Sequence, residues 1–188
     1  MGRVWRPEHA ILDSRWRRSF GDASRPLVQR YLRRGIHERI TADGGVLFEL
    51  DETQARAELD VLRRCGVTGV AICLINAYVN PAHEVRLREL VREVLGDVPC
   101  SISSDVSPLA KEYARASTTV IDTLMKIIYT DYTAKLEKGL ADLGFSGELN
   151  FADCAATLVP SGRAMELPFR IVFSGPAAGT VGCAHFGG

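Results

Sequence analysis

The chain has 188 residues, of which 46% are hydrophobic and 24% charged, and its 23 basic side chains balance its 23 acidic ones. Such a chain buries an apolar core, which excludes a disordered or collagen-like protein. Its apolar runs are far shorter than the roughly 20 residues of a membrane-spanning helix, and it opens with no signal-peptide pattern, so we expect one cytoplasmic domain that contacts no membrane.

Charge is unevenly distributed along the chain. Residues 1–39 contain ten Arg and four acidic residues, hence a net charge of +6, which leaves −6 for the rest. Basic segments can bind nucleic acid, but this one contains no Lys and no recognisable RNA or DNA module. We therefore expect residues 1–26 to form a basic irregular arm, residues 27–188 to form the domain, and nucleic acid not to be a partner.

Strands and helices alternate through the domain. In chain order we expect strands at 34–40 and 46–48 forming a hairpin, a helix at 52–65, a strand at 70–75, a helix at 81–96, a strand at 99–103, a helical region at 107–143 broken near 117–119, strands at 148–152 and 169–173, and a short helix from 174. Asp51 can cap the first helix, and Gly66 and Gly96 stand where C-terminal caps occur. The apolar run 70–75 predicts a buried strand, so we expect an α/β layer with part of its sheet parallel.

The long helical region carries a second pattern. One apolar stripe is predicted along its second half, made by Tyr129, Tyr132, Leu136, Leu140 and Leu143. Asp105 or Ser107 is the predicted cap at its start.

Cysteine and histidine spacing indicates no metal centre. The five cysteines contain no Cys-x-x-Cys pair, and the four histidines are scattered. We expect no metal, no disulfide framework, and buried thiols in a reducing compartment.

One candidate binding stretch opens the final helix. It consists of Ser174, Gly175, Pro176, Ala177, Ala178 and Gly179. Small residues after a strand, with a proline in the first helical turn, leave backbone N–H groups free for an anion such as phosphate. The stretch matches neither common nucleotide-binding motif. The alternative is that its small residues let the helix pack closely on the sheet, and both interpretations stay open.

A second candidate loop follows the predicted strand at 70–75. Asn80, His83 and Glu84 lie where open α/β sheets commonly bind ligands. His83 and Glu84 have acid–base chemistry, but adjacent residues on a helix point in different directions, and the helix dipole alone favours Glu84 there. These residues are thus a substrate loop or a structural one. The polar stretch from Ser101 to Arg115 has no catalytic Ser–Lys spacing, so no catalytic residue is assigned.

Several stretches, in this order, carry a family resemblance: 34–40 with Asp43–Gly44, 50–52, 69–74 running on to 80–84, 103–108, 111–120 and 174–179. Together they resemble the ATP-dependent hydantoinase and 5-oxoprolinase family, whose relatives include subunits of acetone and acetophenone carboxylases. The resemblance implies a fold of the actin, Hsp70 and sugar-kinase type, which is ribonuclease H-like, with a mixed sheet, flanking helices, and ATP and Mg²⁺ between two halves.

The same resemblance implies an activity and partners. Family members use ATP to activate a cyclic amide (5-oxoproline, hydantoin) or a ketone for hydrolysis or carboxylation. The implied partners are the remainder of a hydantoinase A-like chain and a hydantoinase B-like subunit. The family's Gly-Gly-Thr and Asp-x-Gly-Gly-Thr phosphate loops are not found in the sequence, so we expect a partial subunit that is inactive alone. The alternative is a truncated, non-catalytic paralogue that acts as an interaction module.

Overall fold

The computed structural model describes residues 26–187. The chain divides into two compact units, residues 1–35 and 36–188. In the first unit the described residues form a 3₁₀ turn, η2 (Arg30–Leu32), followed by Arg33, whose guanidinium donates to the Val28 carbonyl at 3.0 and 3.1 Å. The predicted basic arm, apart from Pro26, lies outside the described residues.

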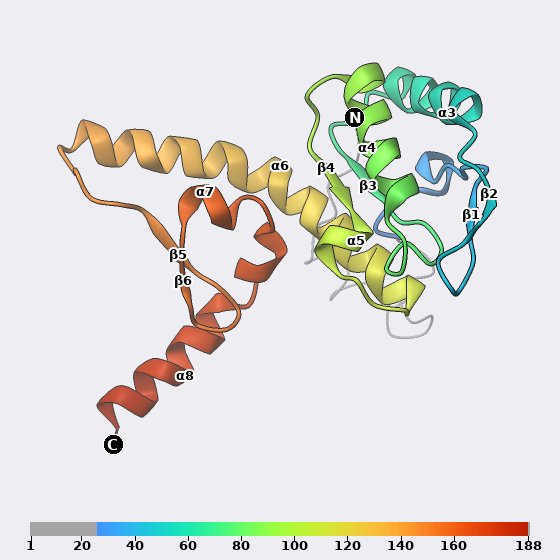
Figure 1. The fold of residues 1–188 in the computed structure, drawn as a ribbon. Coiled ribbons are helices and arrows are strands. Elements are labelled where there is room, and N and C mark those ends of the chain that lie inside the picture. The colour runs from blue at the N-terminus through green and yellow to red at the C-terminus, as the bar shows by residue number, and fades with distance from the viewer. Residues whose placement is uncertain (1–25, 188) are drawn as a thin grey trace, which may run out of the picture. The chain divides into compact units, whose positions relative to one another are not determined.

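The second unit alternates helices and strands, as Figure 1 shows. Its elements are β1 (Arg39–Ile40), β2 (Val46–Phe48), α3 (Glu52–Arg64), β3 (Val70–Ile72), α4 (Ala82–Leu95), β4 (Cys100–Ile102), α5 (Ser103–Val106), α6 (Glu112–Asp142), β5 (Asn150–Ala152), β6 (Leu158–Pro160), α7 (Ser161–Ala164), η3 (Pro168–Ile171) and α8 (Ser174–Phe186). Within residues 36–187 the strands pair two by two: β1 with β2 and β5 with β6 are antiparallel, and β3 with β4 is parallel. The chain therefore mixes helix and strand with one parallel pair, while the actin-type arrangement remains a prediction.

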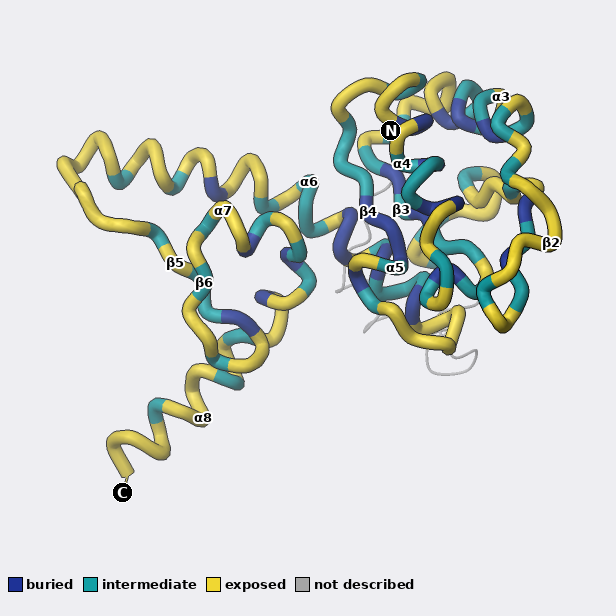
Figure 2. Tube along the Cα trace, viewed as in Figure 1, coloured by how far each residue is buried: buried dark blue, intermediate teal, exposed yellow. Residues whose placement is uncertain are grey.

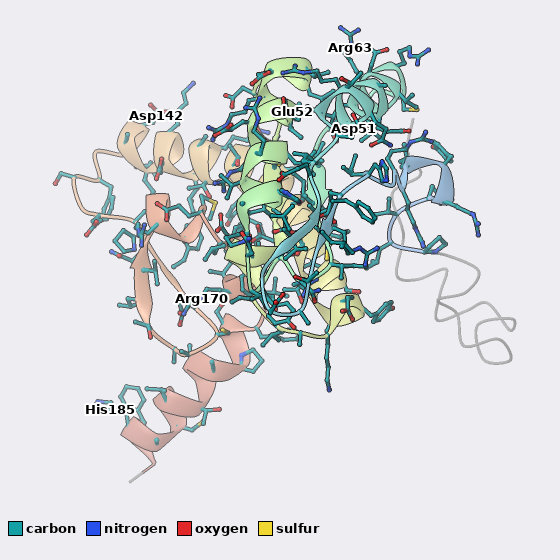
Figure 3. The ribbon with its side chains drawn as sticks, turned by 45° about the vertical axis from the view of Figure 1, so that its right-hand side comes forward. Asp51, Glu52, Arg63, Asp142, Arg170 and His185 are labelled. Carbon is teal, nitrogen blue, oxygen red and sulfur yellow. The ribbon has the colours of Figure 1, made fainter. Side chains whose placement is uncertain are left out.

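Helix α3 forms as its local sequence predicts. The Asp51 carboxylate accepts the Gln54 N–H at 2.9 Å, and Gly66 follows the helix with a φ of 68°. Asp51 and Glu52 lie at the start of the helix and Arg63 near its end, where the helix dipole favours each charge (Figure 3). The buried residues of α3 are Ala55, Leu59 and Leu62, and α3 packs against α4.

The parallel pair β3–β4 carries the centre of the core. Val70 is opposite Cys100 and Ile72 is opposite Ile102, with α4 as the crossover between the strands. Val70, Ile72 and Ile102 are buried, and α6 packs on both strands. Gly69 permits that approach, because a Cβ there would lie 2.9 Å from Ile127 Cδ1.

Helix α6 is one continuous helix of 31 residues, so the predicted break near 117–119 is wrong. The hydroxyls of Thr118 and Thr119 donate to the carbonyls four residues back, at 2.8 and 2.7 Å, which accommodates these β-branched residues within the helix. The predicted start at 107 is also wrong, because residues 107–111 form an irregular segment after α5. Neither Asp105 nor Ser107 caps α6: its N-cap is Lys111, without a side-chain hydrogen bond.

The predicted apolar stripe on the second half of α6 is only partly covered. Tyr132 and Leu143 are 52% and 85% exposed, whereas Thr133 between them is buried. The other three members of the stripe are half-buried: Tyr129, Leu136 and Leu140. Tyr129, Leu136 and Leu140 lie on the same side of the helix as Thr133, so the predicted stripe is partly confirmed and is wrong for Tyr132 and Leu143.

The C-terminal segment confirms one predicted strand and contradicts another. The strand predicted at 148–152 is confirmed as β5, but residues 169–173 form no strand. Their backbone is used otherwise: the Phe169 N–H donates to Asp122 at 3.3 Å, and the Arg170 carbonyl accepts the Cys154 N–H at 2.7 Å. With Pro168 opening the segment, these bonds favour the 3₁₀ turn η3 over a sheet ladder.

No helix in the described part of the chain is long and apolar enough to cross a membrane.

The expectation of buried thiols is wrong for three of the five free cysteines, because Cys65, Cys154 and Cys183 are exposed. Cys100 is half-buried, and burial raises the pKa of its thiol to about 11.

Candidate functional site

Glu84 is fully buried at the carboxyl ends of β3 and β4. Its Oε1 accepts the Leu74 N–H at 2.8 Å and the Ser103 hydroxyl at 2.6 Å. Its Oε2 accepts the Ser104 N–H at 2.9 Å. The carboxylate therefore joins the segments that leave the two strands. Both carboxylate oxygens of Glu84 are thereby occupied by groups of the protein.

Arg115 holds the same strand end from the other side. It is fully buried on α6 and donates to the Leu74 carbonyl at 2.7 Å and the Leu109 carbonyl at 2.6 Å. Its guanidinium carbon lies 5.4 Å from the centroid of the Tyr78 ring, a cation–π contact. The Leu74 N–H is thus bound by the buried Glu84 carboxylate, and the Leu74 carbonyl by the buried Arg115 guanidinium. We call Glu84, Ser103, Ser104 and Arg115 the strand-end cluster.

Two atoms of the strand-end cluster have no hydrogen-bond partner among the described residues. They are Arg115 Nε and Ser104 Oγ, and both are buried. The other side-chain polar atoms of Glu84, Ser103 and Arg115 have partners within the protein, and these bonds hold the loop after β3.

His83 and Asn80 attach that loop and α4 to the β1–β2 hairpin. His83 is buried, with Nδ1 2.8 Å from Glu38 Oε2 and Nε2 3.8 Å from Glu49 Oε2. Asn80 donates to the Gly44 carbonyl at 2.8 Å and accepts the Ala82 N–H at 3.1 Å. The structure therefore brings Asn80, His83 and Glu84 into one region, each with protein partners.

Asp122 and Ser101, with Lys126 beside them, form a second buried polar group that was not predicted from the sequence. Asp122 is fully buried; its Oδ2 accepts the Ser101 hydroxyl at 2.6 Å and lies 3.1 Å from Lys126 Nζ. Asp122 lies seven residues after Arg115, on the same side of α6. The only local sign of this buried group is that two charged residues, Arg115 and Asp122, are seven residues apart on a helix. The partner of Asp122, Ser101 on β4, is 21 residues away in the sequence.

The first turn of α8 contrasts with both clusters. Phe173 at its N-cap makes no side-chain hydrogen bond, and α8 has no buried residue. Gly175, Pro176, Ala178 and Gly179 are exposed, and Ser174 and Ala177 are half-buried. Apart from adjacent residues and the backbone of α8 itself, no described heavy atom lies within 4 Å of a Cβ built at Gly175 or Gly179. Free N–H groups at an uncapped helix start suit an anion.

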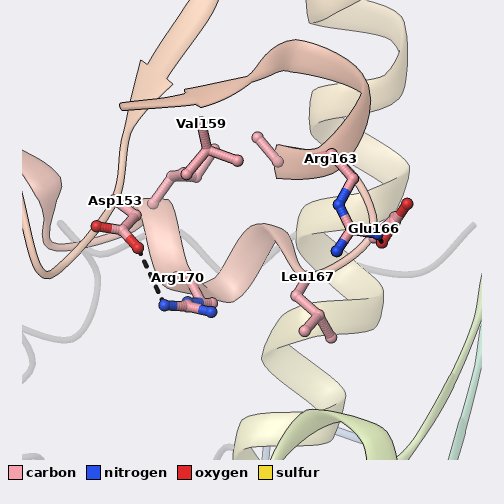
Figure 4. A pocket seen from close by; sticks show the side chains of 8 residues that line it. Asp153, Val159, Arg163, Glu166, Leu167 and Arg170 are labelled. Atoms are coloured by element: carbon pink, nitrogen blue, oxygen red, sulfur yellow. Dashed lines mark hydrogen bonds and ion pairs between the residues drawn. The ribbon is translucent and has the colours of Figure 1, made fainter. Parts of the chain in front are cut away.

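One small cavity lies beside β6 and η3 (Figure 4). Its volume is about 100 Å³, and its lining residues are Asp153, Val159, Arg163, Ala164, Glu166, Leu167, Arg170 and Ile171. The Arg170 guanidinium lies 3.0 Å from Asp153. The Thr157 N–H, and then the Ala155 N–H and Arg170, hold the pKa of Asp153 below its usual value. Ligand pockets usually exceed about 300 Å³, so this cavity is too small for a nucleotide.

Metal ligation has no candidate in the part of the chain that the structure describes. No group of three or more His, Cys, Asp or Glu side chains within residues 26–187 is arranged to hold an ion.

Comparisons with known proteins match nearly the whole chain. The family model described as "Hydantoinase/oxoprolinase N-terminal region" matches residues 1–95, and that described as "Hydantoinase/oxoprolinase" matches residues 115–188. The caprolactamase subunit alpha of Pseudomonas jessenii is 33% identical over 152 residues, which are 81% of this chain and 22% of that protein. The acetophenone carboxylase gamma subunit of Aromatoleum aromaticum is 33% identical over 168 residues, 86% of this chain and 22% of that subunit.

A solved structure agrees with these sequence matches. The crystal structure of the ATP-dependent caprolactamase from Pseudomonas jessenii is similar with a TM-score of 0.74 and 30% identity, over 87% of this chain and 24% of that one. The chain thus spans about a quarter of the length of these relatives.

Proposed function

This chain belongs to the hydantoinase/oxoprolinase family, and from that premise we propose that it forms part of an enzyme that uses ATP to activate a cyclic amide or a ketone. The similar proteins include an ATP-dependent caprolactamase and a ketone carboxylase subunit, and these two support a cyclic amide or a ketone as the substrate. Phosphorylation of an amide or carbonyl oxygen makes a poorly reactive group reactive, and it depends mainly on positioning phosphates and metal.

The observation that carries the proposal is the open first turn of α8. The residues that would hold a phosphate there are Ser174, Gly175, Pro176, Ala177, Ala178 and Gly179. The backbone N–H groups of the first turn have no side-chain cap, and a Cβ built at Gly175 would lie in open space. Bound ATP with Mg²⁺ supplies the phosphoryl group. The chain's own contribution is to orient a phosphate at the positive end of the helix dipole.

The strand-end cluster has a different part in this proposal. Glu84 and Arg115 hold the loop after β3 in one conformation, and their polar contacts lie within the protein. They keep this loop rigid and take no part in proton transfer. The remainder of a hydantoinase A-like chain and a hydantoinase B-like subunit complete the enzyme in this proposal.

Nucleotide binding tests the proposal directly. Titration calorimetry with ATP and Mg²⁺, on the chain alone and together with a hydantoinase B-like subunit, measures the dissociation constant. We expect Gly175→Val to weaken binding about tenfold or more, because its side chain would enter the phosphate space. Gly182→Val is the matched control, since Gly182 lies on the same helix, also in open space. Equal dissociation constants for the two variants would contradict the phosphate site.

Turnover then separates the substrate classes. Phosphate release is measured with caprolactam, 5-oxoproline, hydantoin and acetone in the presence of the partner subunits. One substrate that stimulates ATP hydrolysis identifies the class. A non-catalytic interaction module is the second candidate, favoured by the exposed apolar side chains of α6. It predicts a stable complex without measurable ATP binding by the chain.

A further inference from the structure

Between residues 121 and 132 one side of α6 has four exposed apolar residues, and the exposed ion pair of Lys135 with Asp131 follows on the same side. Ile121, Leu124, Ile128 and Tyr132 are 37%, 51%, 52% and 52% exposed. Their spacing of three, four and four residues places them on one side of a helix. We call these four residues the outer face of α6. Figure 2 shows that most of the second half of this helix is exposed.

The opposite side of α6 is polar and buried. Arg115, Thr119, Asp122 and Thr123 are 0–5% exposed. Each has partners inside the protein: for example, Thr123 donates to the Thr119 carbonyl at 3.0 Å, and Asp122 accepts the Ser101 hydroxyl. Over residues 115–132 several polar residues are thus buried while four apolar residues are exposed, the opposite of the usual pattern for an amphipathic helix.

This reversal has a physical consequence. Apolar area gains about 25 cal/mol per Å² when it leaves water, and a contiguous apolar patch usually marks an interaction site. Helix α8 adds a second uncovered apolar element, because its 13 residues contain no acidic residue, Lys or Arg, and none is buried. Interfaces that stay assembled are more apolar than reversible ones, so the outer face fits a permanent partner.

We propose that the outer face of α6 is the docking surface for the remaining portion of a hydantoinase A-type polypeptide. The family match over residues 115–188 includes α6 and α8, and the structural similarity to the caprolactamase covers 87% of this chain. The matched portion is 24% of the caprolactamase chain, so about three quarters of such a polypeptide is available to cover this face. The inference rests on the proposed function, since it names the partner surface of that enzyme.

Complex formation without nucleotide tests this surface. The probe is the caprolactamase alpha polypeptide of Pseudomonas jessenii without the portion matched by this chain, co-expressed with the full chain. Size exclusion with light scattering should show a 1:1 complex. Leu124→Asp and Ile128→Asp should each weaken it about 100-fold or more, as expected for residues at the centre of an apolar interface. Ala134→Asp is the matched control, because Ala134 is exposed about a third of a turn away and should leave affinity unchanged.

Three outcomes would overturn the inference. They are absence of a complex with a probe whose circular dichroism and thermal unfolding show that it is folded, equal weakening by Leu124→Asp and Ala134→Asp, and a homodimer of this chain that Leu124→Asp dissociates. The thermal midpoints of the variants check folding and should stay within about 4 °C of the wild type. If an Asp variant unfolds, amide hydrogen exchange of residues 121–132 is compared between the wild-type complex and the free chain. Docking on the outer face should slow this exchange, and an unchanged rate would contradict the inference. The assay contains no ATP, so failure of the proposed phosphate site leaves its result unaffected.

Discussion

The strand-end cluster and the first turn of α8 each stand where a polypeptide leaves one element and enters a helix, yet they differ in every physical property. Glu84 and Arg115 are charged, fully buried and bound to backbone groups. Gly175 and Gly179 are uncharged, exposed and without neighbours at their Cβ positions within the described residues. Removing one partner of a buried charge is costly, whereas a helix start without a side-chain cap has N–H groups that lack an intrahelical partner. In this chain the ionisable side chains of Glu84 and Arg115 stabilise the fold, whereas small uncharged residues form the exposed start of α8.

Removing the carboxylate of Glu84 should have the largest effect. Glu84→Leu leaves the Leu74 N–H, the Ser103 hydroxyl and the Ser104 N–H without their acceptor, and we expect the free energy of unfolding to fall by about 3 kcal/mol or more. Urea unfolding followed by circular dichroism measures it. Glu89→Leu, on the exposed side of α4, should cost less than about 0.5 kcal/mol. Similar losses in both variants would contradict a structural frame at Glu84.

Filling the space at Gly69 should have the next largest effect. An added Cβ would lie 2.9 Å from Ile127 Cδ1 and 3.0 Å from Thr123 Cγ2, so Gly69→Ala should lower the free energy of unfolding by roughly 1–3 kcal/mol. Thermal unfolding measures the change. Gly139→Ala in open space on α6 is the control and should not destabilise. An unchanged midpoint for Gly69→Ala would mean that α6 does not pack closely on β3.

Gly179→Ala should have a small effect of opposite sign. Beyond adjacent residues and the backbone of α8 itself, nothing described lies within 4 Å of its Cβ position. Alanine is favoured over glycine inside a helix, so stability should rise by roughly 0.5–1 kcal/mol. The midpoint of urea unfolding measures it. Destabilisation would show that another surface covers α8 in the isolated chain.

The smallest effect concerns acid stability. The folded-state pKa of Asp153 lies below its ordinary value of 3.8, chiefly because its carboxylate accepts the Thr157 N–H. Its contribution to stability is therefore complete above that value and is lost as the pH falls through the lower, folded-state pKa. We expect Asp153→Asn to be less stable than the wild type at pH 7 and to lose less further stability below pH 4. Parallel stability curves of the two proteins from pH 7 to pH 2 would contradict this.

Local sequence determined the parts of the molecule whose bonds are local. Helix α3 could be predicted because its cap, Asp51, and its terminating Gly66 act within a few residues. The parallel strand β3 could be predicted because a strand covered on both faces is apolar throughout. The family was recognisable for a related reason, since short motifs in a fixed order survive in the sequence itself.

Tertiary structure alone decided which of the candidate residues are buried. Glu84 meets Leu74 and Ser103 over 10 and 19 residues, and Arg115 meets Leu74 over 41. The strand predicted at 169–173 failed for the same reason, because Asp122, 47 residues away, takes the Phe169 N–H. The spacing of residues on α6 predicts that it is a helix, but only its neighbours determine that a polar side faces the core and an apolar side faces outward, because burial depends on contacts that no local pattern contains.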